Sequence, residues 1–469
     1  MSPVLPSLVS YISKASRRGG KTVPPGLSGQ QQNEDCLFLD VISPSKVFAK
    51  GRRENHGSLA PVLFNIHGGG YFSGDKTAIY NPRGLLERGK DDFVYVSINY
   101  RLGAFGFLAA VEPSSANYTS PNAGFLDQRY ALKWVQKYIH LFGGDPQQVT
   151  ITGESSGGTS VLRHLVAYGG SKPEESGLFI RGVVQSPSLT PIDPQYLKLG
   201  ANLFLQSAGV STVDEARNLS TEVLQKAQKQ AQVSGPFNVQ FFTPVVDDDV
   251  LLDYPTRLLK EGKYFKNVTM IAAHNFNEGR HFANQSVSTD ADFDNWAYQL
   301  FLSTPNVAEK VIKEVYPPLY DGSLPYKNPL ERLELCTMEL SVACSTNAIG
   351  VVPELQSRNY LFSIDPGTHA QDLAYTYYPT GATPGFYPAI AEGLQEYLTH
   401  YILTGDLSHK MDLPAWPLYS THAHVLNITE AGFSQAKDPA ANNRCQYWNS
   451  VPYFAKPGQV ADAHTNMTG

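Results

Sequence analysis

The chain contains 469 residues, of which 42% are hydrophobic and 17% charged, and its 43 acidic and 37 basic residues give a net charge of −6. This balance, together with the lack of a long basic run, argues against nucleic acid as a partner. No window approaches the ~18 continuous apolar residues of a spanning helix, so no transmembrane segment is predicted. The length suits one large α/β domain or two ordinary ones, and the sequence gives no indication of oligomeric state.

The chain starts with an irregular segment and continues as an alternation of strands and helices. Residues 1–32 are rich in Ser, Gly, Pro and Gln, and we expect one domain over residues 33–469 because no linker interrupts that range. Compact apolar runs predict buried strands at 61–66, 93–99, 149–152, 181–185, 268–273 and 359–364. Residues 128–142 have the apolar spacing of an amphipathic helix. This alternation predicts an α/β fold with a mostly parallel sheet and helices on both faces.

The first candidate for chemistry is the pentapeptide G-E-S-S-G at residues 153–157, which fits the pattern G-x-S-x-G. A predicted strand enters it and a predicted helix, 159–165, leaves it, which is the setting that holds a nucleophilic serine on a sharp turn. The two glycines lack the Cβ that would collide across such a turn. This geometry makes Ser155 the nucleophile and leaves Ser156 at the helix start, where its backbone N–H faces the reacting oxygen.

A second glycine-rich stretch follows an earlier predicted strand. His67 is followed by Gly68, Gly69 and Gly70. Three successive glycines expose backbone N–H groups and let a substrate approach, as an oxyanion hole requires. A plain glycine-rich turn is the alternative, and the serine turn downstream favours the oxyanion hole.

These motifs belong to longer blocks that resemble the type-B carboxylesterase and lipase family, which includes cholinesterases and many fungal esterases. The blocks are E-D-C-L-F-L-D-V (34–41), N-I-H-G-G-G-Y-F-S-G (65–74), N-Y-R-L-G-A-F-G-F-L (99–108), N-A-G-F-L-D-Q-R-Y-A-L-K-W-V-Q (122–136) and F-G-G-D-P-Q-Q-V-T-I-T-G-E-S-S-G-G (142–158). The resemblance covers the chain from about residue 33 onward. It implies an α/β-hydrolase fold, hydrolysis of small-molecule or lipid esters, and Gly69, Gly70 and Ser156 as oxyanion donors.

The acid of an α/β-hydrolase follows the nucleophile in the chain, and the histidine follows the acid. Residues 275–279 resemble the N-x-D-E-G turn of the family, with Asn277 in place of Asp, and they follow the predicted strand 268–273. Glu278 is therefore the expected acid. The alternative is the run Asp247-Asp248-Asp249, which precedes that strand.

The base is expected among twelve histidines. The turn D-P-G-T-H-A-Q-D-L, at 365–373, resembles the G-x-H-x-x-D/E-L/I turn of the family and nominates His369. His67 is expected to be structural, and His164 lies too close to the nucleophile in sequence. The predicted triad is thus Ser155, Glu278 and His369, with no metal and no organic cofactor.

Two further expectations concern the substrate and the cellular location. Tyr71 and Phe72, just past the glycines, are expected to line the acyl side of the substrate. Six N-x-S/T sequons exceed the roughly three expected by chance, which favours a secreted glycoprotein, whereas residues 1–18 make a poor signal peptide. The sequons lie at Asn117, Asn218, Asn267, Asn284, Asn427 and Asn466.

The family usually carries a longer segment before E-D-C, with a cysteine that pairs with the one at Cys36 and, in lipases, a lid. We therefore expect a shortened front end in which Cys36 lacks its usual partner. Cys336 and Cys344 would lie about 12 Å apart along one helix axis, too far for a bridge. Cys445 is a possible partner for either.

The leading interpretation is a serine carboxylic-ester hydrolase that works through an acyl-enzyme on Ser155. A lipase or sterol esterase is the first alternative. A truncated inactive product, or a non-catalytic cholinesterase-like domain of the cell-adhesion type, is the second. Because such non-catalytic relatives lose triad members, the presence of all three residues here favours the enzyme.

Overall fold

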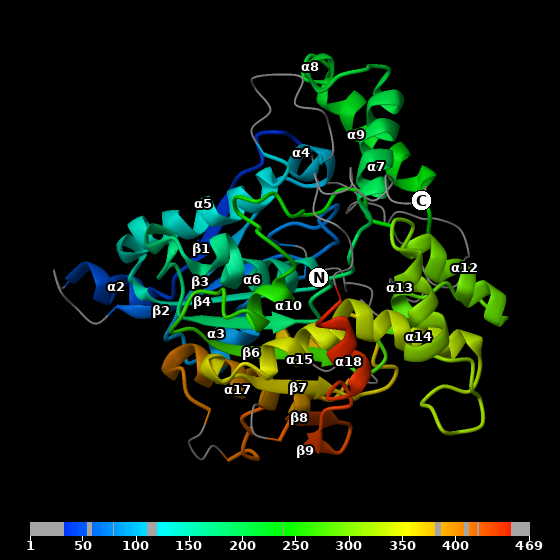
Figure 1. Cartoon of the computed structure of the whole chain (residues 1–469). Coiled ribbons are helices and arrows are strands. Elements are labelled where there is room, and N and C mark those ends of the chain that lie inside the picture. Colours follow the sequence, from blue (N-terminus) through cyan, green and yellow to red (C-terminus); the bar gives the residue numbers. More distant parts are fainter. Residues whose placement is uncertain are drawn as a thin grey trace.

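A nine-stranded sheet organises the computed structural model, with the order β1-β3-β2-β4-β5-β6-β7-β8-β9 (Figure 1). Strands β2 to β8 are parallel, and β1 and β9 add antiparallel edges. The strands are Leu39–Ile42 (β1), Ala60–Ile66 (β2), Val94–Ile98 (β3), Gly144–Glu154 (β4), Arg181–Gln185 (β5), Thr269–Asn275 (β6), Arg358–Phe362 (β7), His424–Thr429 (β8) and Gly432–Lys437 (β9). The predicted fold class is confirmed.

The structure describes residues 32–53, 59–77, 79–109, 120–237, 239–379, 386–407, 412–419 and 422–451. The irregular segment expected at 1–32, apart from its last residue, lies outside this range. So do the sequons at Asn117 and Asn466. In the part of the chain described, no helix combines the length and the apolar character that crossing a membrane requires.

All six predicted strands belong to the sheet. The prediction for β5 matches its bounds, whereas β4 begins five residues earlier than the predicted strand and ends two residues later. The sequence did not predict β1 and β9, which form the edges of the sheet, or β8, which pairs with β7 and β9.

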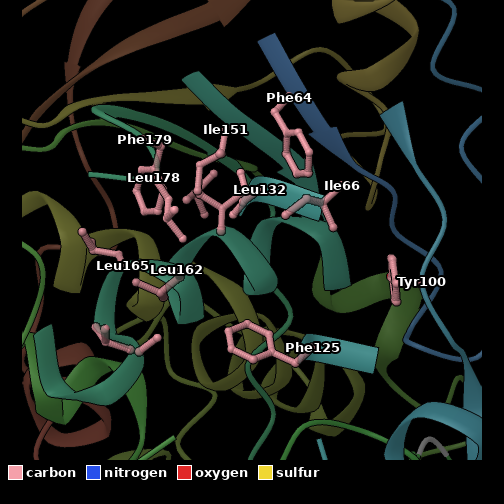
Figure 2. Packing of buried hydrophobic residues seen from close by; sticks show 14 of the residues in the cluster. Phe64, Ile66, Tyr100, Phe125, Leu132, Ile151, Leu162, Leu165, Leu178 and Phe179 are labelled. Carbon is pink, nitrogen blue, oxygen red and sulfur yellow. The ribbon is translucent and has the colours of Figure 1, made fainter. Parts of the chain in front are cut away.

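Alternation along the central strands divides the core between the two faces of the sheet. In β2, Phe64 and Ile66 pack on one face, and Leu63 packs on the other. Figure 2 shows Phe64, Ile66 and Ile151 on the first face, close to Leu132 of α5 (Ala123–Tyr138) and Leu162 of α6 (Ser156–Val166). The second face is covered by α3 (Arg83–Arg88) and α17 (Pro388–Thr404), which contact each other. Burial on both faces explains why these strands read as nearly continuous apolar runs.

Two helical insertions follow the carboxyl ends of β5 and β6, and they gather at the right of the sheet in Figure 1. The first comprises α7 (Pro194–Ala208), α8 (Val213–Ala216) and α9 (Thr221–Ser234). The second comprises α11 (Gly279–Phe282), α12 (Asp290–Leu300), α13 (Pro305–Lys310) and α14 (Pro329–Met338). The remaining α-helices are α2 (Ser45–Arg53), α4 (Gly103–Phe107), α10 (Pro255–Lys260), α15 (Cys344–Gly350), α16 (Leu373–Thr376) and α18 (Asn443–Trp448).

One disulfide joins Cys344 of α15 to Cys445 of α18, across 101 residues of sequence. The sequence left open which cysteine pairs with Cys445, and the structure pairs it with Cys344. Cys336 is a buried free thiol and Cys36 a partly buried one.

Candidate active site

The turn between β4 and α6 presents Ser155 in a conformation that few residues adopt. Its φ is 56° and its ψ is −125°, whereas Glu154 ends the strand and Ser156 begins the helix. The turn is closely packed, because a Cβ added to Gly157 would lie 2.1 Å from the backbone oxygen of Ile66. A strained serine on a glycine-bounded turn is the arrangement that G-x-S-x-G predicts.

Three side chains that are far apart in sequence form one chain of hydrogen bonds. The Nε2 atom of His369 lies 2.9 Å from the hydroxyl oxygen of Ser155, and Nδ1 lies 2.6 Å from Oε2 of Glu278. The structure therefore brings the predicted serine, histidine and carboxylate together in the expected order. Ser155 is partly exposed, whereas the other two are buried.

The carboxylate of Glu278 is fully buried and held in place by several donors. Its Oε1 accepts hydrogen bonds from the backbone N–H of Asn275 at 2.6 Å and from the hydroxyl of Ser186 at 2.7 Å. Burial raises the pKa of Glu278, but the contact with His369 and these hydrogen bonds outweigh burial, so the net pKa is lowered. The group is held ionised, and it fixes the N–H of His369 Nδ1 toward itself.

Glu154 also lies at the site, and the sequence reasoning did not single it out. It is buried, and its Oε1 lies 3.3 Å from Nε2 of His369, with no hydrogen-bond partner among the described residues. Burial raises the pKa of Glu154 to about 8. Burial lowers the pKa of His369, but the attraction of Glu154 and Glu278 outweighs it and raises that pKa to about 9. A carboxylate directly before Ser155 in the turn G-E-S-S-G was the available signal.

Asp372, three residues after His369, anchors the turn that carries the histidine. Its carboxylate accepts hydrogen bonds from the hydroxyl of Tyr360 at 2.5 Å and from the side-chain amides of Asn275 and Gln185 at 3.2 Å each. Asn275 thus contacts both Asp372 and Glu278. The acid and base turns are locked to one another through this buried network.

The glycine loop after β2 places backbone N–H groups beside the serine turn. Gly69 and Gly70 have φ values of 113° and 65°, which glycine adopts without a steric cost. The N–H groups of Gly69, Gly70 and Ser156 donate to no acceptor in the described part of the chain. The N-terminus of α6, an 11-residue helix, adds a partial positive charge at Ser156. The arrangement can receive an anionic oxygen.

Tyr71 and Phe72 lie in different surroundings. Tyr71 is only 1% exposed, and its hydroxyl accepts a hydrogen bond from Arg163 at 2.9 Å and lies 3.1 Å from that of Ser160. Tyr71 is therefore buried behind the glycine loop. The sequence predicted that its side chain would contact the substrate, and its burial argues against that contact. Phe72 is partly exposed. Gln240, which the sequence reasoning did not single out, packs over the loop, because a Cβ on Gly70 would lie 2.8 Å from its Nε2.

The alternative acids and bases lie in other roles. Asp247 accepts backbone hydrogen bonds from Asp249, Val250 and Leu251, so it shapes its own turn. His67 stacks on Tyr100 at 4.4 Å, and burial lowers the pKa of His67 to about 4. His164 is buried and lies 3.1 Å from the side chain of Gln128. Within the described residues, no cluster of three or more His, Cys, Asp or Glu side chains could hold a metal ion.

A mostly parallel sheet with a serine on the turn after β4, a carboxylate after β6 and a histidine after β7 defines a serine hydrolase of the α/β-hydrolase fold. Comparison with known proteins gives the family. The carboxylesterase family matches residues 12–448. The chain therefore belongs to the carboxylesterase family, and its reaction is the hydrolysis of carboxylic esters.

Individual relatives agree with this assignment. Carboxylesterase patB of Aspergillus clavatus is 34% identical over 440 residues, which cover 92% of this chain and 78% of that protein. A secreted lipase of Arthroderma benhamiae is 27% identical, over 91% of this chain and 85% of its own. The crystal structure of Aspergillus niger EstA superposes with a TM-score of 0.75 and 26% identity, covering 91% of this chain and 86% of that one.

Proposed function

We propose that Ser155, His369 and Glu278 are the catalytic nucleophile, base and acid of this ester hydrolase. The observation that carries the proposal is the continuous hydrogen-bond chain from the Ser155 hydroxyl through the imidazole to the buried carboxylate. In this assignment the backbone N–H groups of Gly69, Gly70 and Ser156 form the oxyanion hole. Phe72 and Gln240 contact the substrate, and Tyr71 only supports the loop.

The roles follow from the positions of the groups. His369 Nε2 accepts the proton of Ser155 as the serine oxygen bonds to the ester carbonyl carbon, and the three N–H groups stabilise the negative charge on the carbonyl oxygen. The carbon–oxygen bond to the alcohol then breaks, and the alcohol leaves with the proton from His369. Water, activated by the same imidazole, attacks the acyl-enzyme and releases the acid. Glu278 stabilises the imidazolium throughout.

The proposal is tested with an organophosphate and short p-nitrophenyl esters. Mass spectrometry is expected to find one covalent adduct on the peptide that contains Ser155, and none in Ser155→Ala. Glu278→Gln keeps the shape of the side chain but removes its charge, so kcat is expected to fall by about 10³–10⁴. An adduct that persists in Ser155→Ala, or full activity in Glu278→Gln, would refute these assignments.

A lipase is the second candidate, because several relatives are named secreted lipases. The two relatives named carboxylesterase are more similar, at 34% identity against 27–30%. We therefore propose soluble esters of small acids as the preferred substrates. Higher activity on emulsified triglyceride than on dissolved p-nitrophenyl butyrate would reverse this order.

We further propose that the protein is secreted and glycosylated, on the basis of the relatives named secreted lipases and of the sequons. The side chains of Asn218 and Asn267 are exposed and can carry glycans. Asn427 lies within β8 and its Oδ1 accepts a hydrogen bond from Ser363 at 2.6 Å, so it is a poor acceptor. Treatment of the protein from a eukaryotic host with a glycosidase is expected to lower its mass and to mark Asn218 and Asn267. Secreted protein with no mass change would contradict the proposal.

A further inference from the structure

A second cleft, of about 500 Å³, lies outside the candidate active site. It is bounded by α10, α15 and α18, which lie together over one face of the sheet (Figure 1). Lys266 and Glu354, which line it, come just before β6 and β7, whereas Glu278 and His369 follow the carboxyl ends of the same strands. The cleft therefore opens toward the opposite end of the sheet from the triad. Its volume falls in the range of small-molecule sites.

The floor of the cleft is apolar. Leu259 of α10, Ala348 of α15 and Val352 line it, and they are 3%, 5% and 9% exposed. Val351, also in the lining, is 56% exposed, so the apolar surface continues to the rim. An alkyl chain laid along this surface would remove apolar area from water, which favours binding.

The rim carries more positive than negative charge. Lys266 donates a hydrogen bond to the backbone oxygen of Gly262 at 2.9 Å and lies over the ring of Tyr264. Glu354 accepts a hydrogen bond from the Tyr264 hydroxyl at 3.3 Å. The side chain of Lys260 makes no hydrogen bond or ion pair with any described residue. An uncommitted ammonium group beside an apolar floor suits a ligand with one anionic head and one apolar chain.

We propose that this cleft binds a free monocarboxylic acid with a medium-length alkyl chain. The carboxylate lies at Lys260, and the chain lies on Leu259 and Val352. The cleft has room for one medium-length chain rather than for a diacyl lipid. Carboxylic acids in general are products of ester hydrolysis, so the cleft would hold a ligand with the same head group as a product, away from the catalytic serine. The proposal goes beyond the reaction itself and does not depend on the residue roles given above.

The probe is decanoate, titrated calorimetrically into the full-length protein after its serine has been blocked with an organophosphate. Lys260→Glu is expected to weaken binding by about tenfold or more, because it removes the partner and adds a like charge. Lys263→Glu is the matched control: it makes the same charge change three residues away, at an exposed side chain paired with Glu261 and outside the cleft lining. It is expected to leave the affinity unchanged.

Two further measurements test the apolar part of the cleft. Val351→Trp places a large ring at the mouth without disturbing the buried floor, and it is expected to abolish binding. Decanol, which has the same chain without the carboxylate, is expected to bind weakly and without dependence on Lys260. Failure of the blocked protein to bind decanoate, or equal losses in Lys260→Glu and Lys263→Glu, overturns the proposal. If the serine does not react with the organophosphate, the proposed triad fails, and the same variants still locate binding in the unblocked protein.

Discussion

Two carboxylates, rather than one, act on the candidate base. Glu278 bonds to Nδ1 of His369, and Glu154 lies 3.3 Å from Nε2 on the side that faces Ser155. Glu278 fixes the tautomer of His369 in which Nδ1 carries the proton. Above its own raised pKa of about 8 the second carboxylate, Glu154, is ionised, and its negative charge then favours the imidazolium. The same charge stabilises the imidazolium that forms as Ser155 attacks.

This arrangement predicts the pH dependence of activity. His369 accepts a proton only when it is neutral, and its pKa is raised to about 9, so activity should be lost as the pH falls below that value. Glu154→Gln removes the attraction, which lowers the pKa of His369. The acid limb of the kcat/KM profile is therefore expected to move to lower pH by about one unit. The measurement is kcat/KM on a p-nitrophenyl ester at a series of pH values from about 5 to about 10.

The control for this prediction is Glu154→Asp, which keeps the negative charge and is expected to keep the acid limb near its wild-type position. A profile that does not move in Glu154→Gln would show that Glu154 has no electrostatic effect on the base.

The contact between β2, β4 and α6 fixes the relation between the nucleophile and the glycine loop. Gly157, the second residue of α6, has no room for a side chain, because an added Cβ would lie 2.1 Å from the backbone oxygen of Ile66. Ile66 leads directly into His67 and the glycine loop. A residue larger than glycine at position 157 therefore moves the serine turn away from the N–H groups of Gly69 and Gly70.

Gly157→Ala is expected to lower kcat by about 10²–10³, the loss seen when one oxyanion donor is removed. It is also expected to destabilise the fold by about 1–3 kcal/mol, the usual cost of overpacking. The measurements are kcat on p-nitrophenyl acetate and the urea midpoint. Gly177→Ala is the comparison for backbone strain without overpacking, because a Cβ there meets nothing within 4 Å although φ is 70°. A Gly157→Ala enzyme with wild-type kcat would refute the close approach.

Local sequence predicts the central strands β2 to β7 and fails at the two edge strands and at β8, the neighbour of one edge. The runs that became β2 to β7 are apolar and bounded by turns, so their pattern is sufficient. Strand β9, G-F-S-Q-A-K, is mostly exposed, and its pairing with β8 supplies the strand character that its composition lacks.

Local sequence likewise predicts some residues of the site and not others. The Ser155 turn, the glycine loop and the turns of Glu278 and His369 have local motifs, and the sequence predicted each of them. The roles of Glu154 and Tyr71 depend on contacts with residues more than 80 positions away, namely His369 for the first and Ser160 for the second. Such contacts leave no local pattern, so only the folded chain reveals them.

The complete site is assembled at one end of the molecule from loops that follow four parallel strands. The glycine loop follows β2, the serine turn follows β4, and the acid and base turns follow β6 and β7. Parallel strands deliver their carboxyl ends to one edge of the sheet, so residues 67 to 372 converge there. The sheet that stabilises the fold therefore also sets the positions of the site residues.

The disulfide between Cys344 and Cys445 closes a loop that contains β7, the His369 turn and β8. Cross-linking a loop of about 100 residues restricts the unfolded chain and typically stabilises a protein by about 2–5 kcal/mol. In the folded state, α18 is also attached by Arg444, whose guanidinium contacts both carboxylate oxygens of Glu339 at 2.7 Å. Removing the disulfide should therefore lower stability without displacing His369.

The double variant Cys344→Ala and Cys445→Ala is expected to lose about 2–5 kcal/mol of unfolding free energy, measured by urea denaturation. Its kcat/KM at 25 °C is expected to equal that of the wild type, because the triad and its hydrogen bonds remain in place. Cys36→Ser, which removes a free thiol instead, is expected to change neither quantity. Reducing agent should lower the urea midpoint of the wild type and leave that of the double variant unchanged. Equal sensitivity of both proteins to reduction would mean that the bond does not contribute to stability.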